Sequence, residues 1–149
     1  KKSLSMLFSR FMVEAGPSVR RTMQRKNCDI AVPVHVPQGF SVSVFNIDYR
    51  GFNSLPMGAM SMFNAEYFFA GRRGPAYRKV FRGPTTDSYL LRNRLNATAM
   101  TWSRCGQDVN LRANTSMFVR SGRADALATV DSADLRAGLV YHLRWRRCR

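Results

Sequence analysis

Apolar and polar residues alternate along most of this chain. Residues 30–36 and 111–120 show the pattern most clearly, with an apolar side chain at every second position. A period of two is typical of a strand that buries one face and exposes the other. Glycine and proline separate the segments, and no long helical pattern is present. The pattern predicts an all-β fold, with about nine or ten short strands in an antiparallel β-sandwich that is jelly-roll-like or immunoglobulin-like.

The alternation places the strands and the breaks between them. We expect strands at residues 4–11, 30–36, 40–52, 65–70, 77–81, 89–91, 100–103, 111–120, 126–130 and 141–148, and loops or turns at 14–27, 53–60 and 131–138. Pro33 cannot donate a ladder hydrogen bond, which predicts an edge strand or a bulge there. The alternation slips at Phe45, which predicts a bulge or corner. A short helix at 124–135 is the alternative, but β-branched Thr129 and Val130 favour a strand.

The length of 149 residues suits one domain with a core of its own, so residues 1–149 are expected to form a single β-sandwich. No apolar run is long enough to span a membrane as a helix. No signal peptide is visible, and the chain begins with Lys1 rather than methionine. We therefore expect that an N-terminal segment before Lys1 has been removed or left out.

The charge of the chain indicates what kind of partner it could bind. The formal net charge is +15, from 24 basic and 9 acidic residues, and most of the basic residues are arginine. Arginine makes forked hydrogen bonds to carboxylate, sulfate or phosphate, so an anionic partner is expected; a merely solvated basic face is the alternative. The candidate anion-binding residues are Arg20, Arg21, Arg25, Lys26, Arg72, Arg73, Arg78, Arg144, Arg146 and Arg147, and Lys79 and Arg82 extend the middle cluster.

Three cysteines bear on the compartment and the architecture. A cross-link between Cys28 and Cys148 would tie an early strand to the last one and would bring residues 25–26 close to residues 144–147. Such a bond makes sense only in an oxidising compartment. Cys105 would then stay a free thiol or find a partner outside these 149 residues. No metal site is expected, because the chain has no Cys-x-x-Cys and its two histidines are far from any cysteine pair.

Catalytic motifs and cofactor-binding motifs are missing. His35 and His142 could act as base and acid of a metal-free ribonuclease, but no motif supports that role and unrelated surface histidines are the simpler interpretation. The scattered carboxylates offer no opposed pair for a glycosidase; the closest in sequence, Asp131 and Asp134, are more typical of a turn. Nucleophile-elbow and phosphate-loop motifs are absent. We expect no enzyme and no cofactor.

Two sequons add possible modification sites. Asn96-Ala97-Thr98 falls in an expected loop, and Asn114-Thr115-Ser116 falls on a strand with Asn114 on the face opposite the core residues. Asn96 and Asn114 are therefore glycosylation candidates, although such triplets often arise by chance.

An ordered set of phrases carries a family resemblance. The phrases are RKNC at 25–28, VPQGF at 36–40, DYRGF at 48–52, YFFAG at 67–71, FRGP at 81–84, TWSRCG at 101–106 and WRRC at 145–148. Together they resemble a family of small secreted proteins of unassigned function that is well represented in fungi. The resemblance spans residues 4–148 and implies a secreted, disulfide-bonded all-β domain without established activity or known catalytic residues.

The resemblance also bears on Cys105. Family members usually carry a further cysteine in an N-terminal segment before the first strand, and that segment is absent from this sequence. Loss of that partner would explain the odd cysteine, and a free thiol or an intermolecular bridge is the alternative. The strongly basic charge departs from the family pattern.

Two functions remain after these exclusions. The leading hypothesis is a non-catalytic extracellular building block that self-associates as a homo-oligomer or polymer in a layer or fibre, suggested by edge strands, the odd cysteine and the apolar segment 57–69. The alternative is a binding module for acidic polysaccharide or another polyanion through an arginine-rich patch. Nucleic acid ranks third, because the cysteine pattern fits an oxidising compartment.

Overall fold

Nine strands and one short 3-10 helix make up the part of the chain that is described in the computed structural model, residues 2–7, 11–69, 76–94, 103 and 106–141. The elements are β1 (Lys2–Leu7), β2 (Met12–Ala15), the 3-10 helix η1 (Pro17–Val19), β3 (Met23–Val34), β4 (Phe40–Leu55), β5 (Met60–Phe69), β6 (Ala76–Arg82), β7 (Thr85–Arg94), β8 (Val109–Arg120) and β9 (Ala126–Tyr141). The described residues contain no α-helix, which confirms the predicted all-β class.

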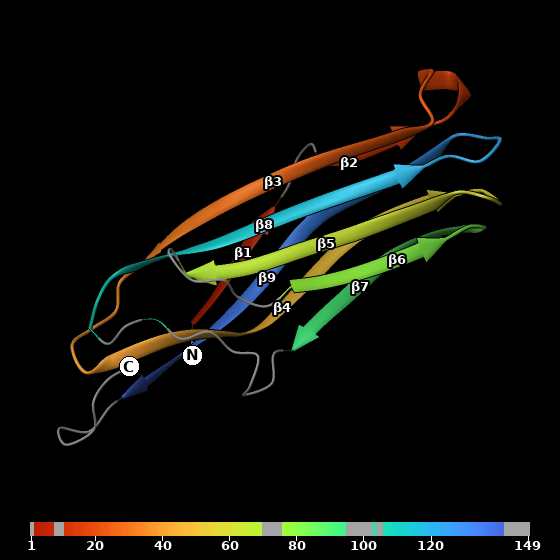
Figure 1. The fold of residues 1–149 in the computed structure, drawn as a ribbon. Coiled ribbons are helices and arrows are strands. Elements are labelled where there is room, and N and C mark those ends of the chain that lie inside the picture. Colours follow the sequence, from red (N-terminus) through yellow and green to blue (C-terminus); the bar gives the residue numbers. More distant parts are fainter. Residues whose placement is uncertain (1, 8–10, 70–75, 95–102, 104–105, 142–149) are drawn as a thin grey trace.

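The strands form two antiparallel sheets that lie face to face (Figure 1). One sheet has the order β1-β9-β4-β7, with β2 also paired to β9, and the other has the order β3-β8-β5-β6. The predicted antiparallel sandwich is confirmed. Of the first strand, expected at residues 4–11, residues 4–7 lie in β1, and β2 begins just after it at Met12; both strands pair with β9.

The core lies between the two sheets and follows the predicted alternation. On β8 the odd-numbered side chains from Leu111 to Val119 are buried, and the even-numbered ones from Asn110 to Arg120 point away from the core. Tyr49 on β4 and Phe63 on β5 meet across the interior with ring centroids 4.5 Å apart. β8 therefore presents an apolar face to the core and turns its other face outward.

Three predicted connections are wrong. Residues 23–27 of the loop expected at 14–27 begin β3, and residues 131–138, expected as a turn, lie inside β9. The loop expected at 53–60 is only 56–59. The reason is tertiary pairing: β9 is hydrogen-bonded on both sides, to β1 and β4, so polar residues continue the strand. At β3 the polar side chains are tolerated because an edge strand is open to solvent.

Two local irregularities fall where the sequence indicated them. Pro33 lies on β3, which is an edge of its sheet, as predicted. The register of β4 against β9 shifts between Val44 and Asn46, which confirms the bulge expected near Phe45. Segment 126–130 is a strand rather than a helix. The strands expected at 100–103 and 141–148 lie outside the described residues, apart from Ser103 and Tyr141.

A second register shift falls between Arg50 and Gly51, the glycine of the DYRGF phrase. Tyr89 on β7 reaches over Gly51 and donates a hydrogen bond from its hydroxyl to the carbonyl oxygen of Thr129 on β9, at 2.6 Å. A Cβ atom at position 51 would lie 2.2 Å from both of these oxygens. Glycine is required here because a tyrosine crosses the strand at close range.

Candidate ligand-binding face

The outward side of the β3-β8-β5-β6 sheet carries its side chains in rows, because directly paired residues of antiparallel strands share a face. We call the first two rows the basic rows; they consist of Met23, Arg120, Met60 and Arg82, followed by Arg25, Phe118, Met62 and Val80. We call the next two the polar rows; they consist of Asn27, Ser116, Asn64 and Arg78, followed by Asp29, Asn114, Glu66 and Ala76. The basic rows lie at the end of the sheet where β8 finishes.

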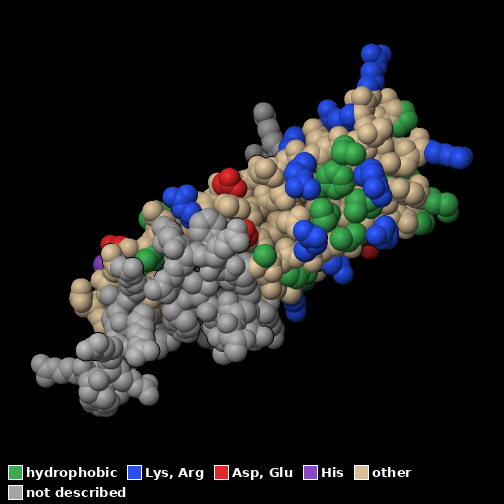
Figure 2. Space-filling view, viewed as in Figure 1, with side chains coloured by type: hydrophobic (Ala, Val, Ile, Leu, Met, Phe, Trp, Pro, Cys, Tyr) green, Lys and Arg blue, Asp and Glu red, His purple; other side chains and the backbone are tan. Residues whose placement is uncertain are grey.

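The basic rows mix arginine with exposed apolar side chains. Met23 is 53% exposed and Val80 is 37% exposed, so apolar side chains stand in solvent among the arginines. The guanidinium of Arg25 lies over the ring of Phe118, 5.5 Å from its centroid, and this cation–π contact holds the arginine against the sheet. Figure 2 shows green apolar and blue basic side chains interspersed over this end of the molecule. The surface can therefore offer both charge-assisted hydrogen bonds and apolar contact.

A shallow groove of about 680 Å³ runs over the polar rows. Its lining includes the amides of Asn27, Asn64 and Asn114 and the carboxylates of Asp29 and Glu66. At the β6 side, Arg78 also lines the groove and donates from Nε to Oδ1 of Asn64 at 2.9 Å. This bond orients the Asn64 amide, so that its nitrogen remains directed as a donor. The groove thus combines hydrogen-bond donors and acceptors on one open surface.

Charge is distributed unequally between the two outer faces. The outward positions of the four-stranded sheet hold five arginines against two carboxylates; the arginines are Arg25, Arg78, Arg82, Arg112 and Arg120. On the outer face of the five-stranded sheet, Arg50 pairs in register with Leu90, and Arg92 pairs with Asp48. Asp131 is exposed nearby. Among the side chains that the structure describes, the four-stranded sheet therefore presents the more positive potential.

The predicted anion-binding residues separate into three groups. Arg25 and Arg78 lie on the outer face, with the two strands β8 and β5 between them. Arg20 and Arg21 follow η1 beyond the sheet, where Arg21 Nε donates to the carbonyl oxygen of Glu14 at 2.9 Å. Lys26 is exposed at the β3 edge, at a position that alternation assigns to the inward side.

The remaining predicted anion-binding residues, which are Arg72, Arg73, Arg144, Arg146 and Arg147, lie outside the described part of the chain. Sequence reasoning missed Arg112 and Arg120, which stand as single arginines within β8 rather than in a basic cluster. The sequence could have indicated that both point away from the core, since they alternate with the buried side chains of the same strand.

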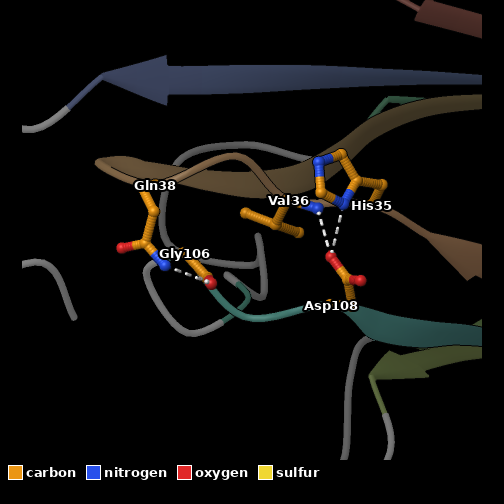
Figure 3. A network of polar contacts seen from close by, with 5 residues as sticks. All are labelled: His35, Val36, Gln38, Gly106 and Asp108. Atoms are coloured by element: carbon orange, nitrogen blue, oxygen red, sulfur yellow. Dashed lines mark hydrogen bonds and ion pairs between the residues drawn. The ribbon is translucent and has the colours of Figure 1, made fainter.

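His35 takes part in a polar network that joins two connections (Figure 3). Its Nδ1 lies 2.8 Å from Oδ1 of Asp108, and the same oxygen accepts a hydrogen bond from the backbone amide of Val36 at 2.9 Å. The Val36 hydrogen bond and, after it, the proximity of His35 hold the pKa of Asp108 below its usual value of 3.8. The network ties the segment after β3 to the residues that lead into β8. His142 lies outside the described residues, so the histidine pair considered for a ribonuclease stays a hypothesis.

Other site chemistry is limited in the described ranges. Among these residues, no group of three or more His, Cys, Asp or Glu side chains comes together in a way that would hold a metal ion. Within the same ranges, no helix has the length and apolarity needed to cross a membrane.

The match over the whole chain decides the family. Residues 1–148 match the family described as "Domain of unknown function (DUF4360)". The chain belongs to the DUF4360 family. It is 28% identical, over 151 aligned residues, to an uncharacterized secreted protein of the fungus Arthroderma benhamiae; the alignment covers 99% of this chain and 62% of that protein. This relative confirms the predicted secreted localisation and a family of unknown function that occurs in fungi.

Two solved structures show weaker likeness to the DUF4360 chain. A chain in the structure of infectious bursal disease virus, Gx strain, matches 97% of this chain and 33% of its own length, with 7% identity and a TM-score of 0.45. The module TmCBM61, solved in complex with β-1,4-galactotriose, matches 94% of this chain and 88% of its own length, with 10% identity and a TM-score of 0.38. At these TM-scores neither likeness bears on the function of the DUF4360 chain.

The cysteine pairing expected for this DUF4360 chain stays a prediction. Cys28 is a half-buried free thiol on β3 in the structure, and it packs against the core between the sheets. Burial and, to a smaller extent, the charge of Asp29 raise the pKa of the Cys28 thiol. Cys105 and Cys148 lie outside the described residues.

The sequon at Asn114 coincides with the groove. Asn114 is exposed on the outer face of β8, as the alternation predicted, and it lies between Asp29 and Glu66 in the second polar row. A glycan on Asn114 would therefore cover the groove. Asn96 lies outside the described residues, and glycosylation at either position stays a prediction.

Proposed function

We propose that this DUF4360 domain is a non-catalytic extracellular binding module for acidic polysaccharide, which lies across the outer face of the β3-β8-β5-β6 sheet. The observation that carries the proposal is the concentration of five arginines on one sheet face. Arginine forks bind carboxylate or sulfate groups with charge-assisted hydrogen bonds, and a flat face accommodates an extended polymer. The apolar side chains of the basic rows would contact the C–H surfaces of sugar rings.

A hydrolytic role fits this face poorly. Asp29 and Glu66 lie on strands of the same sheet and point out from the same side. A glycosidase places its two carboxyl groups on opposite sides of the bond that it cleaves. Two carboxylates that rise from one open surface are better suited to accept hydrogen bonds from a bound ligand, which supports a binding module rather than an enzyme.

Self-assembly into an extracellular layer or fibre is the second candidate. The observation in its favour is the long edge strand β3, since an unpaired edge can add a strand from another copy. Against it stand Pro33, which cannot donate along that edge, and the net charge of +15, which makes copies repel one another. We therefore rank self-assembly below polysaccharide binding.

The test compares paired substitutions on the two outer faces. We expect Arg25→Gln with Arg120→Gln to weaken binding to an acidic polysaccharide about tenfold, because exposed charge contacts contribute on the order of 1 kcal/mol each. The matched control, Arg50→Gln with Arg92→Gln, removes the same charge from the five-stranded sheet and should change affinity far less. Affinity measured by calorimetry over a salt series should also fall with ionic strength.

Two results would count against the proposal. Equal losses from both variant pairs would mean that net charge, and not this face, determines binding. Failure to bind acidic polysaccharide at any salt concentration would exclude the function. Concentration-dependent assembly that survives high salt, measured by light scattering, would instead support the second candidate.

A further inference from the structure

The polar rows contain two carboxylates in the middle of a basic face. Asp29 and Glu66 line the groove together with Asn114, which pairs in register with both of them. Arginines flank this row, with Arg78 in the neighbouring polar row and Arg112 one row further along β8. A surface that only attracted negative charge would gain nothing from carboxylates at its centre, since these repel a dense polyanion.

The groove chemistry instead matches sugar hydroxyl groups. A carboxylate accepts hydrogen bonds, and an asparagine amide both donates and accepts, so together they satisfy a hydroxyl that does both. Sulfate and phosphate oxygens offer acceptors alone and would face Asp29 and Glu66 without a donor. The groove therefore favours a ligand whose surface is mostly hydroxyl, whereas the arginines around it favour one that also carries some negative charge.

From this arrangement, and resting on the proposed function, we propose that the ligand is a sparsely charged uronate polysaccharide. Its pyranose units lie in the groove, and its carboxylates project sideways to the flanking arginines. Neighbouring strands lie about 4.8 Å apart, close to the length of one pyranose unit, so a polymer laid across the strands places about one unit over each strand. The Asn64 amide, oriented by Arg78, is one fixed donor along this path.

The experiment varies charge density along one polymer. The probes are polygalacturonate samples of equal chain length with different degrees of methyl esterification, and a heparin fragment serves as the densely sulfated probe. The protein comes from a host that does not N-glycosylate, because a glycan on Asn114 would cover the groove. Wild-type protein is expected to bind partly esterified polymer several-fold more tightly than fully charged polymer.

Substitution of the central carboxylates is expected to reverse this preference. Glu66→Gln should strengthen binding to heparin and to fully charged polygalacturonate by about fivefold, since one like charge is removed from an exposed face. The same substitution should weaken binding to the partly esterified polymer. Asp29→Asn, on a different strand, provides a second variant with the same expectation. Glu14→Gln on β2 is the matched control, because it removes one charge from the other sheet.

The outcomes distinguish a failure of this inference from a failure of the proposed function on which it rests. If wild-type affinity rises steadily with charge density, the inference is wrong while polyanion binding stands. If no polygalacturonate sample and no heparin binds, both proposals fail. If Glu14→Gln shifts the preference as much as Glu66→Gln does, net charge and not the groove sets selectivity, and the inference again fails.

Discussion

The hydroxyl of Thr115 on β8 donates a hydrogen bond to the phenol oxygen of Tyr49 on β4, so a polar contact joins the two sheets inside the apolar core. Tyr49 in turn donates to Tyr67, whose oxygen also accepts a hydrogen bond from Nδ2 of Asn93 at 3.2 Å. Burial raises the pKa of Tyr49 far above its usual value of 10, which keeps its proton in this chain of bonds. Thr115 therefore contributes a polar link between the two sheets in addition to its packing in the core.

Removal of the Thr115 hydroxyl should destabilise the fold. Thr115→Val keeps the side-chain shape but leaves the Tyr49 oxygen without this donor, and we expect the free energy of unfolding to fall by about 1–2 kcal/mol. Urea denaturation followed by tryptophan fluorescence measures the change. The control is Thr86→Val on the exposed side of β7, which should stay within about 0.5 kcal/mol of wild type. Equal stability of Thr115→Val and wild type would show that the hydroxyl contributes nothing.

Addition of a methyl group at Gly51 should disrupt the β4 crossing. The new Cβ would lie 2.2 Å from the Tyr89 hydroxyl and from the Thr129 carbonyl oxygen, which are bonded to each other. We expect Gly51→Ala to lower the free energy of unfolding by about 2–4 kcal/mol, from steric strain and the lost hydrogen bond. Thermal denaturation by circular dichroism measures the loss.

A double-mutant cycle tests the cause of that loss. Tyr89→Phe alone removes one hydrogen bond and should cost about 1 kcal/mol. Because Gly51→Ala breaks the same bond, the double variant should be less destabilised than the sum of the two single variants. Strict additivity would mean that Gly51 and Tyr89 act independently, contrary to the geometry.

The Asp108 network predicts a pH dependence. The folded-state pKa of Asp108 is lower than its usual value of 3.8, so its charged form stabilises the fold above that pH, and the contribution is lost as pH falls through the folded-state pKa. Asp108→Asn should therefore be less stable than wild type at about pH 7, and the difference should vanish in strong acid, near about pH 2.

Urea unfolding at several pH values would test this expectation. Glu14→Gln provides a control that removes one carboxylate from β2, away from the network. A constant stability difference between wild type and Asp108→Asn across the whole pH range would contradict the role of the Asp108 charge. It would point to packing of the segment after β3 as the cause.

Several features of the fold could be predicted from the local sequence pattern because their physical cause is local. Pro33 lacks an amide hydrogen wherever it lies, so its strand had to be an edge or bulged. The slip at Phe45 reverses the inward face, which requires an extra residue in the strand. By contrast, the polar stretch from Asp131 to Gly138 resembled a turn, and pairing with β1 and β4 on both sides makes it a strand.

The candidate face was only partly predictable. Arg25 and Arg78 were recognised from two basic segments, and the sequence suggested that the first would meet residues 144–147, which lie outside the described range. That contact stays a prediction; the described structure shows that β8 and β5 separate Arg25 and Arg78, which lie on opposite edge strands of one sheet. Arg120, from a strand without a basic cluster, completes the face between them.

The amino-acid sequence by itself determined the β class, the inward and outward faces of strands such as β8, the excess of positive charge and the family. Those properties depend on each residue and its near neighbours, through side-chain alternation and composition. Only the tertiary structure decided the strand order β3-β8-β5-β6 and the register that sets Asp29, Asn114 and Glu66 in one row. Pairing between strands far apart in sequence depends on how two whole sheets bury their apolar faces together, and no local pattern encodes that choice.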